Sequence, residues 1–232
     1  MERLDKAFSS CKIYSRTEIK KIISQKRVKV NGSVVVDGAF KIDLKVDKVF
    51  VDDKEITFKK YSYIMLNKPF GVVSSTDDKD KTVIDILPSS FKREGLFPVG
   101  RLDKDTVGLV ILTDDGISAH KRLSPKSHAE KVYYFETADS VNSETASEIE
   151  KGVLLKDGYL TKPCKVKLIT QKSGEITLTE GKYHEIKRIF GAKGNKITFL
   201  KRISFAGIML DESLGFGECR YLTQEEENLF TL

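Results

Sequence analysis

Apolar side chains recur every three or four positions near the start of the chain and predict two short helices. One stripe covers residues 4–8 and the other covers residues 19–23. Ser15 and Glu18 have the spacing of a capping box, so the second helix should begin just after Ser15. Most cationic residues of this stretch then lie on the outer faces of the two helices.

A different pattern follows, in which charged and apolar residues alternate. Residues 26–32 alternate in this way and end in Asn-Gly, which predicts a strand that enters a hairpin turn. Residues 34–36 supply the returning strand, and residues 46–51 supply a further strand. The first sixty or so residues therefore predict two helices and a small sheet.

Longer apolar runs mark the rest of the chain. Residues 63–68 read as a strand stopped by Pro69, and residues 107–112 read as a buried strand. Asp115 is placed to cap a helix over residues 117–123. Further strands are predicted by the runs at residues 175–179 and 196–199.

Charge divides the chain into two parts. Residues 1–59 carry 14 Lys and Arg against 9 Asp and Glu, whereas residues 60–232 carry 26 against 25. We place the domain boundary here, where no long Gly/Ser linker separates the parts. A small basic domain before a nearly neutral one is typical of a polyanion-binding appendage, although a solvated basic surface without a partner has the same composition.

Composition excludes several classes of protein. With 40% hydrophobic and 32% charged residues, the chain of 232 residues has the composition of a folded, soluble protein. No apolar run approaches the roughly 18 residues of a membrane span, and the N-terminus lacks a signal-peptide core, so we expect a cytoplasmic protein. Cys11, Cys164 and Cys219 are too scattered for a zinc site and indicate reduced thiols.

An acidic loop precedes the strand predicted at residues 107–112. Its Asp103 and Asp105 suggest a calcium loop or a metal-dependent nuclease, but the loop's ligand spacing is wrong for calcium. The adjacent cations Arg101 and Lys104 favour ion pairing with Asp103 instead. Loop aspartates beside strands are often only turn formers, so the residues alone leave a catalytic Asp103 open.

The first segment resembles the S4 RNA-binding domain. The resemblance rests on four blocks: Arg3-Leu4-Asp5-Lys6, Ser15-Arg16, the run from Lys26 to Gly32, and Asp47 to Val51. It implies recognition of structured RNA by shape and phosphate contacts. The residues to which it assigns RNA contact are Arg3, Lys6, Ser15, Arg16, Lys20, Arg27, Lys29 and Asn31.

Residues 60–230 resemble the pseudouridine synthases that act on ribosomal RNA. The four ordered blocks are Lys68-Pro69-x-Gly71-Val72-Val73, Gly100-Arg101-Leu102-Asp103-x-x-Thr106-x-Gly108-Leu109, Glu130-Lys131-Val132-Tyr133, and Glu180-Gly181-Lys182-Tyr183-His184-Glu185-Ile186-Lys187-Arg188-Ile189-Phe190. The Tyr-His form of the last block, with Lys187, is most similar to the enzymes that modify one uridine of 16S ribosomal RNA. Glu185 departs from the family pattern, in which Gln is usual.

The resemblance implies roles for several residues. Asp103 is the expected catalytic carboxylate, Lys187 the cation that keeps it ionised, and Tyr133 the ring that stacks on uracil. Outside the family, Tyr133 would be an ordinary core residue and Arg101 a salt-bridge partner. Expected substrate contacts are Arg101, Leu102, Thr106, His184 and Arg188. The isomerisation requires neither a cofactor nor a metal.

The resemblance also implies the architecture and the partner. We expect an α+β chain, with a small S4 domain followed by a synthase domain around a mostly antiparallel, bent sheet flanked by helices. The expected partner is 16S ribosomal RNA in a partly assembled small subunit, bound by a monomer. A large-subunit (23S) synthase and a non-catalytic assembly factor are the alternatives, whereas DNA binding lacks a recognition-helix signature.

Overall fold

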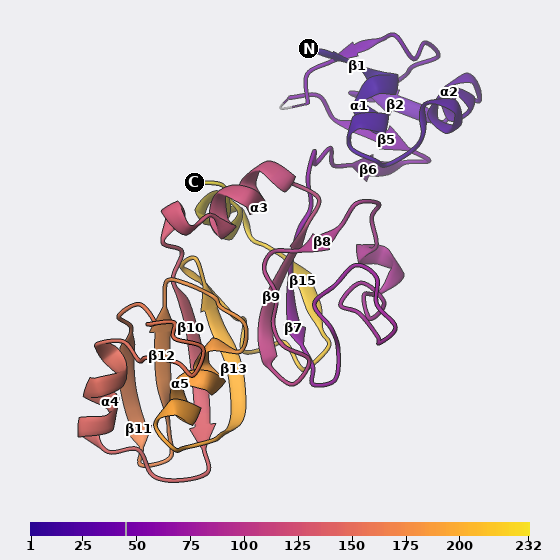
Figure 1. Cartoon of the computed structure of the whole chain (residues 1–232). Helices are drawn as coiled ribbons and strands as arrows, with labels where there is room; N and C mark the ends of the chain where they lie inside the picture. The colour runs from indigo at the N-terminus through magenta and orange to yellow at the C-terminus, as the bar shows by residue number, and fades with distance from the viewer. Residues whose placement is uncertain (45) are drawn as a thin grey trace. The chain divides into compact units, whose positions relative to one another are not determined.

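The computed structural model describes residues 1–44 and 46–232. The chain divides into two compact units, Met1–Ser62 and Tyr63–Leu232, a few residues beyond the boundary placed at residue 59 (Figure 1). Each unit has its own cluster of buried hydrophobic side chains. Within the described ranges, no helix is long and apolar enough to cross a membrane.

Two helices of the first unit follow the predicted stripes. Helix α1 spans Leu4–Ser10 and helix α2 spans Arg16–Ser24, and their apolar faces are buried in one core. The predicted capping box at the start of α2 is confirmed. The Ser15 hydroxyl accepts from the Glu18 N–H at 3.2 Å, and the Glu18 carboxylate accepts from the Ser15 N–H at 2.8 Å.

The first unit contains a four-stranded antiparallel sheet in the order β3-β2-β5-β6. Its strands are β2 (Val28–Val30), β3 (Ser33–Val34), β5 (Val49–Val51) and β6 (Lys54–Ile56), and β1 (Glu2–Arg3) pairs with β4 (Lys41–Ile42) separately. The predicted Asn-Gly hairpin is confirmed, with φ of +50° at Asn31 and +84° at Gly32. The strand predicted from residue 46 begins only at Val49, because Asp47 instead accepts hydrogen bonds from the Asn31 amide and the Asp43 N–H.

A long mixed sheet forms the centre of the second unit, in the order β11-β12-β10-β13-β9-β7-β15. Its strands are β7 (Tyr63–Lys68), β9 (Val107–Thr113), β10 (Lys131–Thr137), β11 (Lys165–Thr170), β12 (Ser173–Leu178), β13 (Ile197–Phe205) and β15 (Cys219–Tyr221), with β8 (Phe97–Pro98) on β9 and β14 (Ile208–Met209) on β13. Only the β9–β13 pair among these described strands is parallel, so the predicted α+β class with a mostly antiparallel sheet is confirmed.

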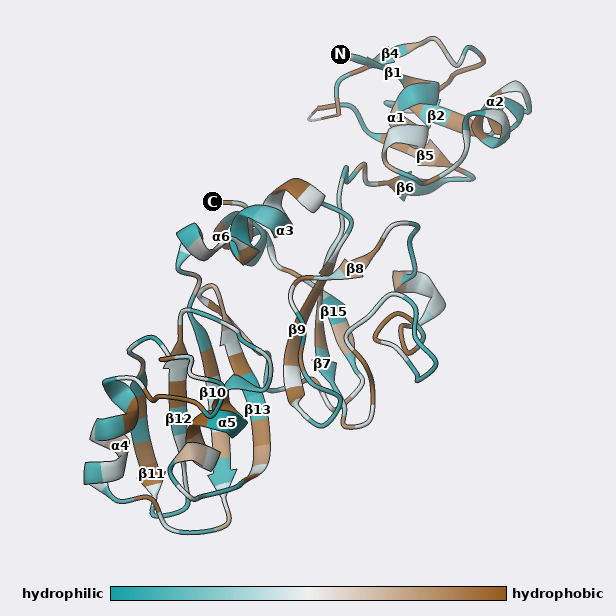
Figure 2. Ribbon diagram, in the orientation of Figure 1, coloured by the Kyte–Doolittle hydropathy of each residue, from teal (hydrophilic) through white to brown (hydrophobic). Residues whose placement is uncertain are grey.

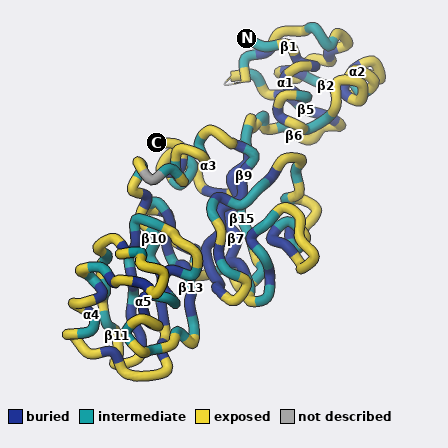
Figure 3. Tube along the Cα trace, in the orientation of Figure 1, coloured by how far each residue is buried: buried dark blue, intermediate teal, exposed yellow. Residues whose placement is uncertain are grey.

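Two halves of this sheet meet where β9 passes β13. Gly108 has φ of +100°, and a Cβ atom there would lie 2.3 Å from the carbonyl oxygen of Arg202. The close crossing therefore requires glycine. Strands β7 and β9 are buried over their whole length (Figure 3), and β9 is drawn largely in hydrophobic colours in Figure 2. The acidic loop leads directly into this buried centre.

Four helices accompany the sheet in the described part of the second unit. They are α3 (Gly116–Leu123), α4 (Ser143–Glu150), α5 (Glu185–Ala192) and α6 (Gln224–Thr231), with short 3-10 turns at Ser89–Phe91 and Pro125–Ser127. Helices α4 and α5 bury their apolar sides in the same core cluster as the sheet. Asp115 caps α3 as predicted, since its carboxylate accepts from the N–H groups of Ile117 and Ser118.

Candidate active site

The acidic loop is held rigidly just before β9. The Thr106 N–H donates to the Asp103 carbonyl at 3.0 Å and closes a turn. The Leu102 N–H donates to the Ser74 hydroxyl at 3.1 Å, and the Gly71 N–H donates to the carbonyl of residue 104 at 2.9 Å. Asp103 therefore sits on a loop that is tied to the core on both sides.

Lys68, at the end of β7, holds this loop in place through hydrogen bonds to its backbone. Its ammonium is fully buried and donates to three carbonyl oxygens, those of Pro69, Lys104 and Thr106, at 3.0, 3.3 and 2.8 Å. Burial lowers the pKa of Lys68 to about 8, although the nearby Asp105 and Asp103 oppose that shift. The sequence showed this lysine only as part of the Lys-Pro block, and its positioning role was missed.

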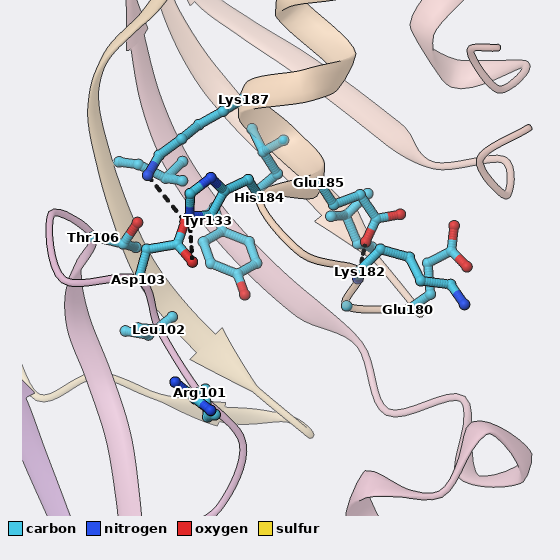
Figure 4. Close-up of a pocket in the computed structure, with 14 residues that line it drawn as sticks. Arg101, Leu102, Asp103, Thr106, Tyr133, Glu180, Lys182, His184, Glu185 and Lys187 are labelled. Atoms are coloured by element: carbon cyan, nitrogen blue, oxygen red, sulfur yellow. Dashed lines mark hydrogen bonds and ion pairs between the residues drawn. The ribbon is translucent and has the colours of Figure 1, made fainter. Parts of the chain in front are cut away.

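Lys187 pairs with both loop aspartates, and its contact with Asp103 is drawn in Figure 4. Its Nζ lies 2.9 Å from Asp103 Oδ2 and 2.5 Å from Asp105 Oδ1. Burial opposes the charge of Lys187, but the hydrogen bonds to Asp105 and Asp103 outweigh it and raise the pKa of Lys187. Burial likewise opposes ionisation of Asp105, yet the Lys187 ammonium lowers the pKa of that carboxyl. Because an ammonium already lies between the carboxylates, the arrangement is an ion-paired cluster and not a calcium loop.

Lys187 lies on the side of helix α5 that faces the loop, because the opposite side of the helix is buried in the core. Ile186, Ile189 and Phe190 are buried, and the Phe190 ring packs 4.8 Å from the Phe135 ring of β10. Lys187 is left on the face toward Asp103. His184, directly before the helix, puts Nε2 at 3.5 Å from Asp103 Oδ1 and stacks on the Tyr183 ring.

Tyr133, on β10, lines the same cavity as Asp103. Its side chain is 8% exposed, and its ring lies beside the Asp103 carboxylate in Figure 4. Leu178 and Leu200 give this cavity, of about 450 Å³, apolar walls next to the ion pair. A cavity with one apolar wall and one charged wall suits a ring that carries polar edges.

Other predicted substrate contacts lie around this cavity at different depths. Leu102 and Thr106 are buried in its lining, 6% and 2% exposed. Arg101 is exposed and lies apart from Asp103, beyond Leu102, in Figure 4. Arg188 forms an ion pair with Asp157.

The expected pairing of Asp103 with its sequence neighbours is wrong for Lys104. The Lys104 ammonium lies 2.7 Å from Asp80 instead. The cation that holds Asp103 is Lys187, which is 84 positions away in the chain. Neighbouring side chains on an extended loop point in different directions, so adjacency in sequence did not select the partner.

A second, larger cavity of about 980 Å³ adjoins the first and shares Arg101, Tyr133, Glu180, Gly181 and Lys182 with it. Its lining is strongly basic, with Arg101, Arg122, Lys131, Lys162, Lys182 and Arg202 around the one carboxylate of Glu180. Among these cations the sequence had singled out only Arg101. Such a lining fits a chain of phosphates leading to the cavity of Asp103.

Most cations predicted to contact RNA in the first unit have acidic partners within it. The ion pairs are Arg3–Asp5, Lys6–Glu2, Arg27–Asp52 and Lys29–Asp53, with closest N–O distances of 2.8, 3.5, 2.5 and 2.6 Å. Arg16 and Lys20 are exposed on α2.

The two polar residues predicted to contact RNA in this unit also hold its structure. Ser15 caps α2. The Asn31 side chain donates to Asp47 at 2.8 Å and accepts from the Lys48 N–H at 2.9 Å. Their side-chain groups are thus engaged in local hydrogen bonds.

Family comparisons agree with this geometry. The model of the RNA pseudouridylate synthase family matches residues 62–192, and the model of the S4 domain matches residues 2–57. The chain belongs to the RNA pseudouridylate synthase family, carries an S4 domain, and is an isomerase.

Individual relatives match nearly the whole chain. The chain is 40% identical over 226 residues to ribosomal small subunit pseudouridine synthase A of Haemophilus influenzae and 41% identical over 228 residues to that of Escherichia coli, with 97% of each chain covered in both cases. It is 40% identical to an uncharacterized RNA pseudouridine synthase of Bacillus subtilis, covering 98% of this chain and 97% of the relative. A crystal structure of a pseudouridylate synthase covers 99% of this chain and 100% of its own, with a TM-score of 0.70 and 38% identity.

Proposed function

We propose that this enzyme converts one uridine of 16S ribosomal RNA to pseudouridine, acting as a monomer on a partly assembled small subunit in the cytoplasm. The observation that carries the chemistry is the Asp103 carboxylate, ion-paired to Lys187 beside Tyr133 in a cavity. The names of the Haemophilus and Escherichia relatives support the small-subunit target.

The reaction conserves all atoms of the nucleotide. The C1′–N1 bond breaks, the uracil rotates, and a C1′–C5 bond forms. The hydrogen of C5 leaves to solvent as a proton, and N1 takes up a proton. Asp103 serves this exchange either by bonding to the substrate as a nucleophile or by stabilising a cationic sugar. Lys187 positions the carboxylate and balances its charge in the half-buried site.

Tyr133 and the apolar wall of the cavity hold the base during its rotation. The Tyr133 ring is large enough to stack on uracil, and Leu178 and Leu200 exclude water behind it. His184 contributes a polar edge 3.5 Å from Asp103. A nucleotide enters such a cavity only after it is drawn out of its stack, so the target uridine is flipped.

The RNA strand is held by cations outside the catalytic cavity. Arg101, Lys131 and Arg122 line the adjoining basic cavity and bind phosphates that flank the flipped nucleotide. In the first unit, Arg16 and Lys20 on α2 are exposed and add contacts to structured RNA. Exposed pairs such as Arg27–Asp52 can exchange the carboxylate for a phosphate at little cost.

Release of tritium from RNA labelled at C5 of uridine tests the proposal, with 16S transcripts, 23S transcripts and partly assembled small subunits as substrates. We expect release from 16S RNA or its particle alone. Release from 23S RNA alone would keep the isomerisation and overturn the target. Absence of release from all three would instead favour a non-catalytic assembly factor.

A further inference from the structure

Glu185, the first residue of α5, has a buried carboxyl group that closes the turn before the helix. Its side chain is 5% exposed. Oε2 accepts from the Lys182 N–H at 2.8 Å, and the Glu185 N–H donates back to the Lys182 carbonyl at 3.2 Å. The carboxyl group therefore fixes the point at which α5 begins, two residues before Lys187.

The other oxygen of this group, Oε1, is buried and receives no hydrogen bond from any residue that the structure describes. The carboxyl group of Glu180 faces it across the turn (Figure 4). A buried carboxylate oxygen that meets a second carboxylate is repelled, unless one of the two groups carries a proton. With a proton on either group, the unfavourable contact becomes a hydrogen bond.

The environment of each group decides which one holds the proton. Glu180 is provided with donors, since Oε2 accepts from the Tyr159 hydroxyl at 2.7 Å and Oε1 accepts from the Lys162 N–H at 2.8 Å. Although burial opposes it, the contact with Glu185 and the hydrogen bonds from the Lys162 N–H and the Tyr159 hydroxyl lower the pKa of Glu180. Burial and the charge of Glu180 raise the pKa of Glu185 to about 7. The proton therefore resides on Glu185.

Of the other titratable groups beside the pair, Tyr159 and Cys164 keep their protons throughout the neutral range. Lys131 of β10 is the cation that acts on Glu185, and its own burial lowers the pKa of that ammonium. Tyr159 has its pKa raised to about 12, first by its hydrogen bond to Glu180. Burial raises the pKa of Cys164 to about 11. The backbone N–H of Lys182 is already bound to Glu185 Oε2, while its ammonium lies over the Tyr159 ring.

We propose that Glu185 is a positioning residue that acts in its protonated form, donating a hydrogen bond from Oε1 to Glu180 and so holding the start of α5 and Lys187 against Asp103. The inference rests on the proposed role of the Asp103–Lys187 pair. Loss of the proton places two like charges in one buried turn and loosens the end of the helix that carries Lys187. A glutamine at this position, which the family pattern usually has, offers a permanent N–H donor of the same shape.

Protonation of Glu185 makes the stability of the fold decrease as the pH rises. A carboxyl group whose pKa is higher in the folded state stabilises the fold below its ordinary value of about 4.3. That contribution is lost as the pH rises through about 7, where Glu185 ionises in the folded protein. The lowered pKa of Glu180 acts at the acidic end, and Lys68 titrates near pH 8, so the contribution of Glu185 is read from the difference between Glu185→Gln and the wild type.

The first measurement is a titration of the wild-type chain labelled with ¹³C at the glutamate carboxyl carbons. The Glu185 resonance, assigned by its absence in Glu185→Gln, should titrate with a midpoint near 7. In Glu180→Gln the midpoint should fall by about one pH unit or more, because the facing charge is gone. A midpoint near the ordinary value of about 4.3 in the wild type would overturn the proposal.

The second measurement compares Glu185→Gln with the wild type from about pH 6 to about pH 8.5, with the exposed Glu212→Gln as matched control. We expect the ratio of variant to wild-type turnover to rise about threefold or more over this range, and the Tm difference to widen by about 2 °C or more. The control should show neither trend. Parallel pH profiles for Glu185→Gln and wild type would overturn the positioning role.

A wild type without tritium release at any pH would instead contradict the proposed function, while the carboxyl titration would still decide the protonation of Glu185.

Discussion

Ion pairs occur in both units of the chain, but in very different surroundings. In the first unit, Arg27 and Lys29 are 46% and 41% exposed and pair with aspartates that are 52% and 80% exposed. In the second, Lys187 is 24% exposed and bridges Asp103 and Asp105 at the edge of a cavity. Exposed pairs are screened by salt and readily exchange partners, whereas a half-buried pair loses that freedom.

Under the proposed function, ion pairs therefore serve two purposes in this chain, binding of RNA in the first unit and positioning of Asp103 in the second. A surface of weakly engaged cations can follow the irregular phosphates of a folded RNA, and no single member of it is indispensable. The cluster of Asp103 has one geometry, fixed by Lys68 beneath the loop and by α5 above it. Substitutions in the Asp103 cluster should therefore have large effects on turnover. Substitutions of the exposed cations of α2, the basic surface, should have small and additive effects on RNA binding.

The largest expected effect follows from Asp103→Asn. The amide can neither attack the substrate nor balance a cationic sugar, so tritium release should fall about a thousandfold or more, while RNA affinity changes less than about threefold. Asp105→Asn is the matched control, because it removes the other carboxylate on the same ammonium and should cost about tenfold or less. A turnover of Asp103→Asn within tenfold of wild type would remove this residue from its role.

Lys187→Met should reduce kcat about a hundredfold, because the carboxylates lose the charge that positions them. Lys187→Arg, which keeps the charge, should recover most of that loss. In the wild type the lowered pKa of Asp105 stabilises the fold above the ordinary aspartate range, and this contribution disappears as the pH falls. The Tm deficit of Lys187→Met should therefore be larger at about pH 7 than at about pH 3, and a deficit independent of pH would contradict the assignment.

Removing three exposed cations from α2 tests the basic surface. The combined Arg16→Ala, Lys20→Ala and Lys21→Ala variant should raise KM for RNA about tenfold, change kcat less than twofold, and flatten the dependence of affinity on salt. The control removes three cations of β11 and the following turn, Lys165, Lys167 and Lys172. Equal losses for both triple variants would mean that α2 has no special part in binding.

The smallest effect should come from Ser15→Ala. Loss of the cap of α2 should lower the free energy of unfolding of the first unit by about 1 kcal/mol, measured by denaturant titration. If Ser15 acts mainly as this cap, RNA affinity at low temperature should stay within about twofold of wild type. An affinity loss of tenfold with intact stability would instead indicate direct contact with RNA.

Local patterns predicted most elements correctly. The stripes of α1 and α2, the capping box at Ser15, the Asn-Gly hairpin and the cap of α3 all depend on residues within a few positions of one another. The strand expected from residue 46 was too long, because Asp47 bonds across the unit to Asn31. Tertiary contacts overrode a local preference at that point.

The sequence by itself determined the local elements of this protein and its basic first unit. It also contains the ordered blocks that resemble the family to which the chain belongs. The tertiary structure alone decided that Lys104 pairs with Asp80, that the Lys68 ammonium anchors the loop, and that Glu185 faces Glu180. The physical reason is that charge interactions depend on distance and burial through space. Residues far apart in the chain acquire those properties only when the sheet and α5 bring them together.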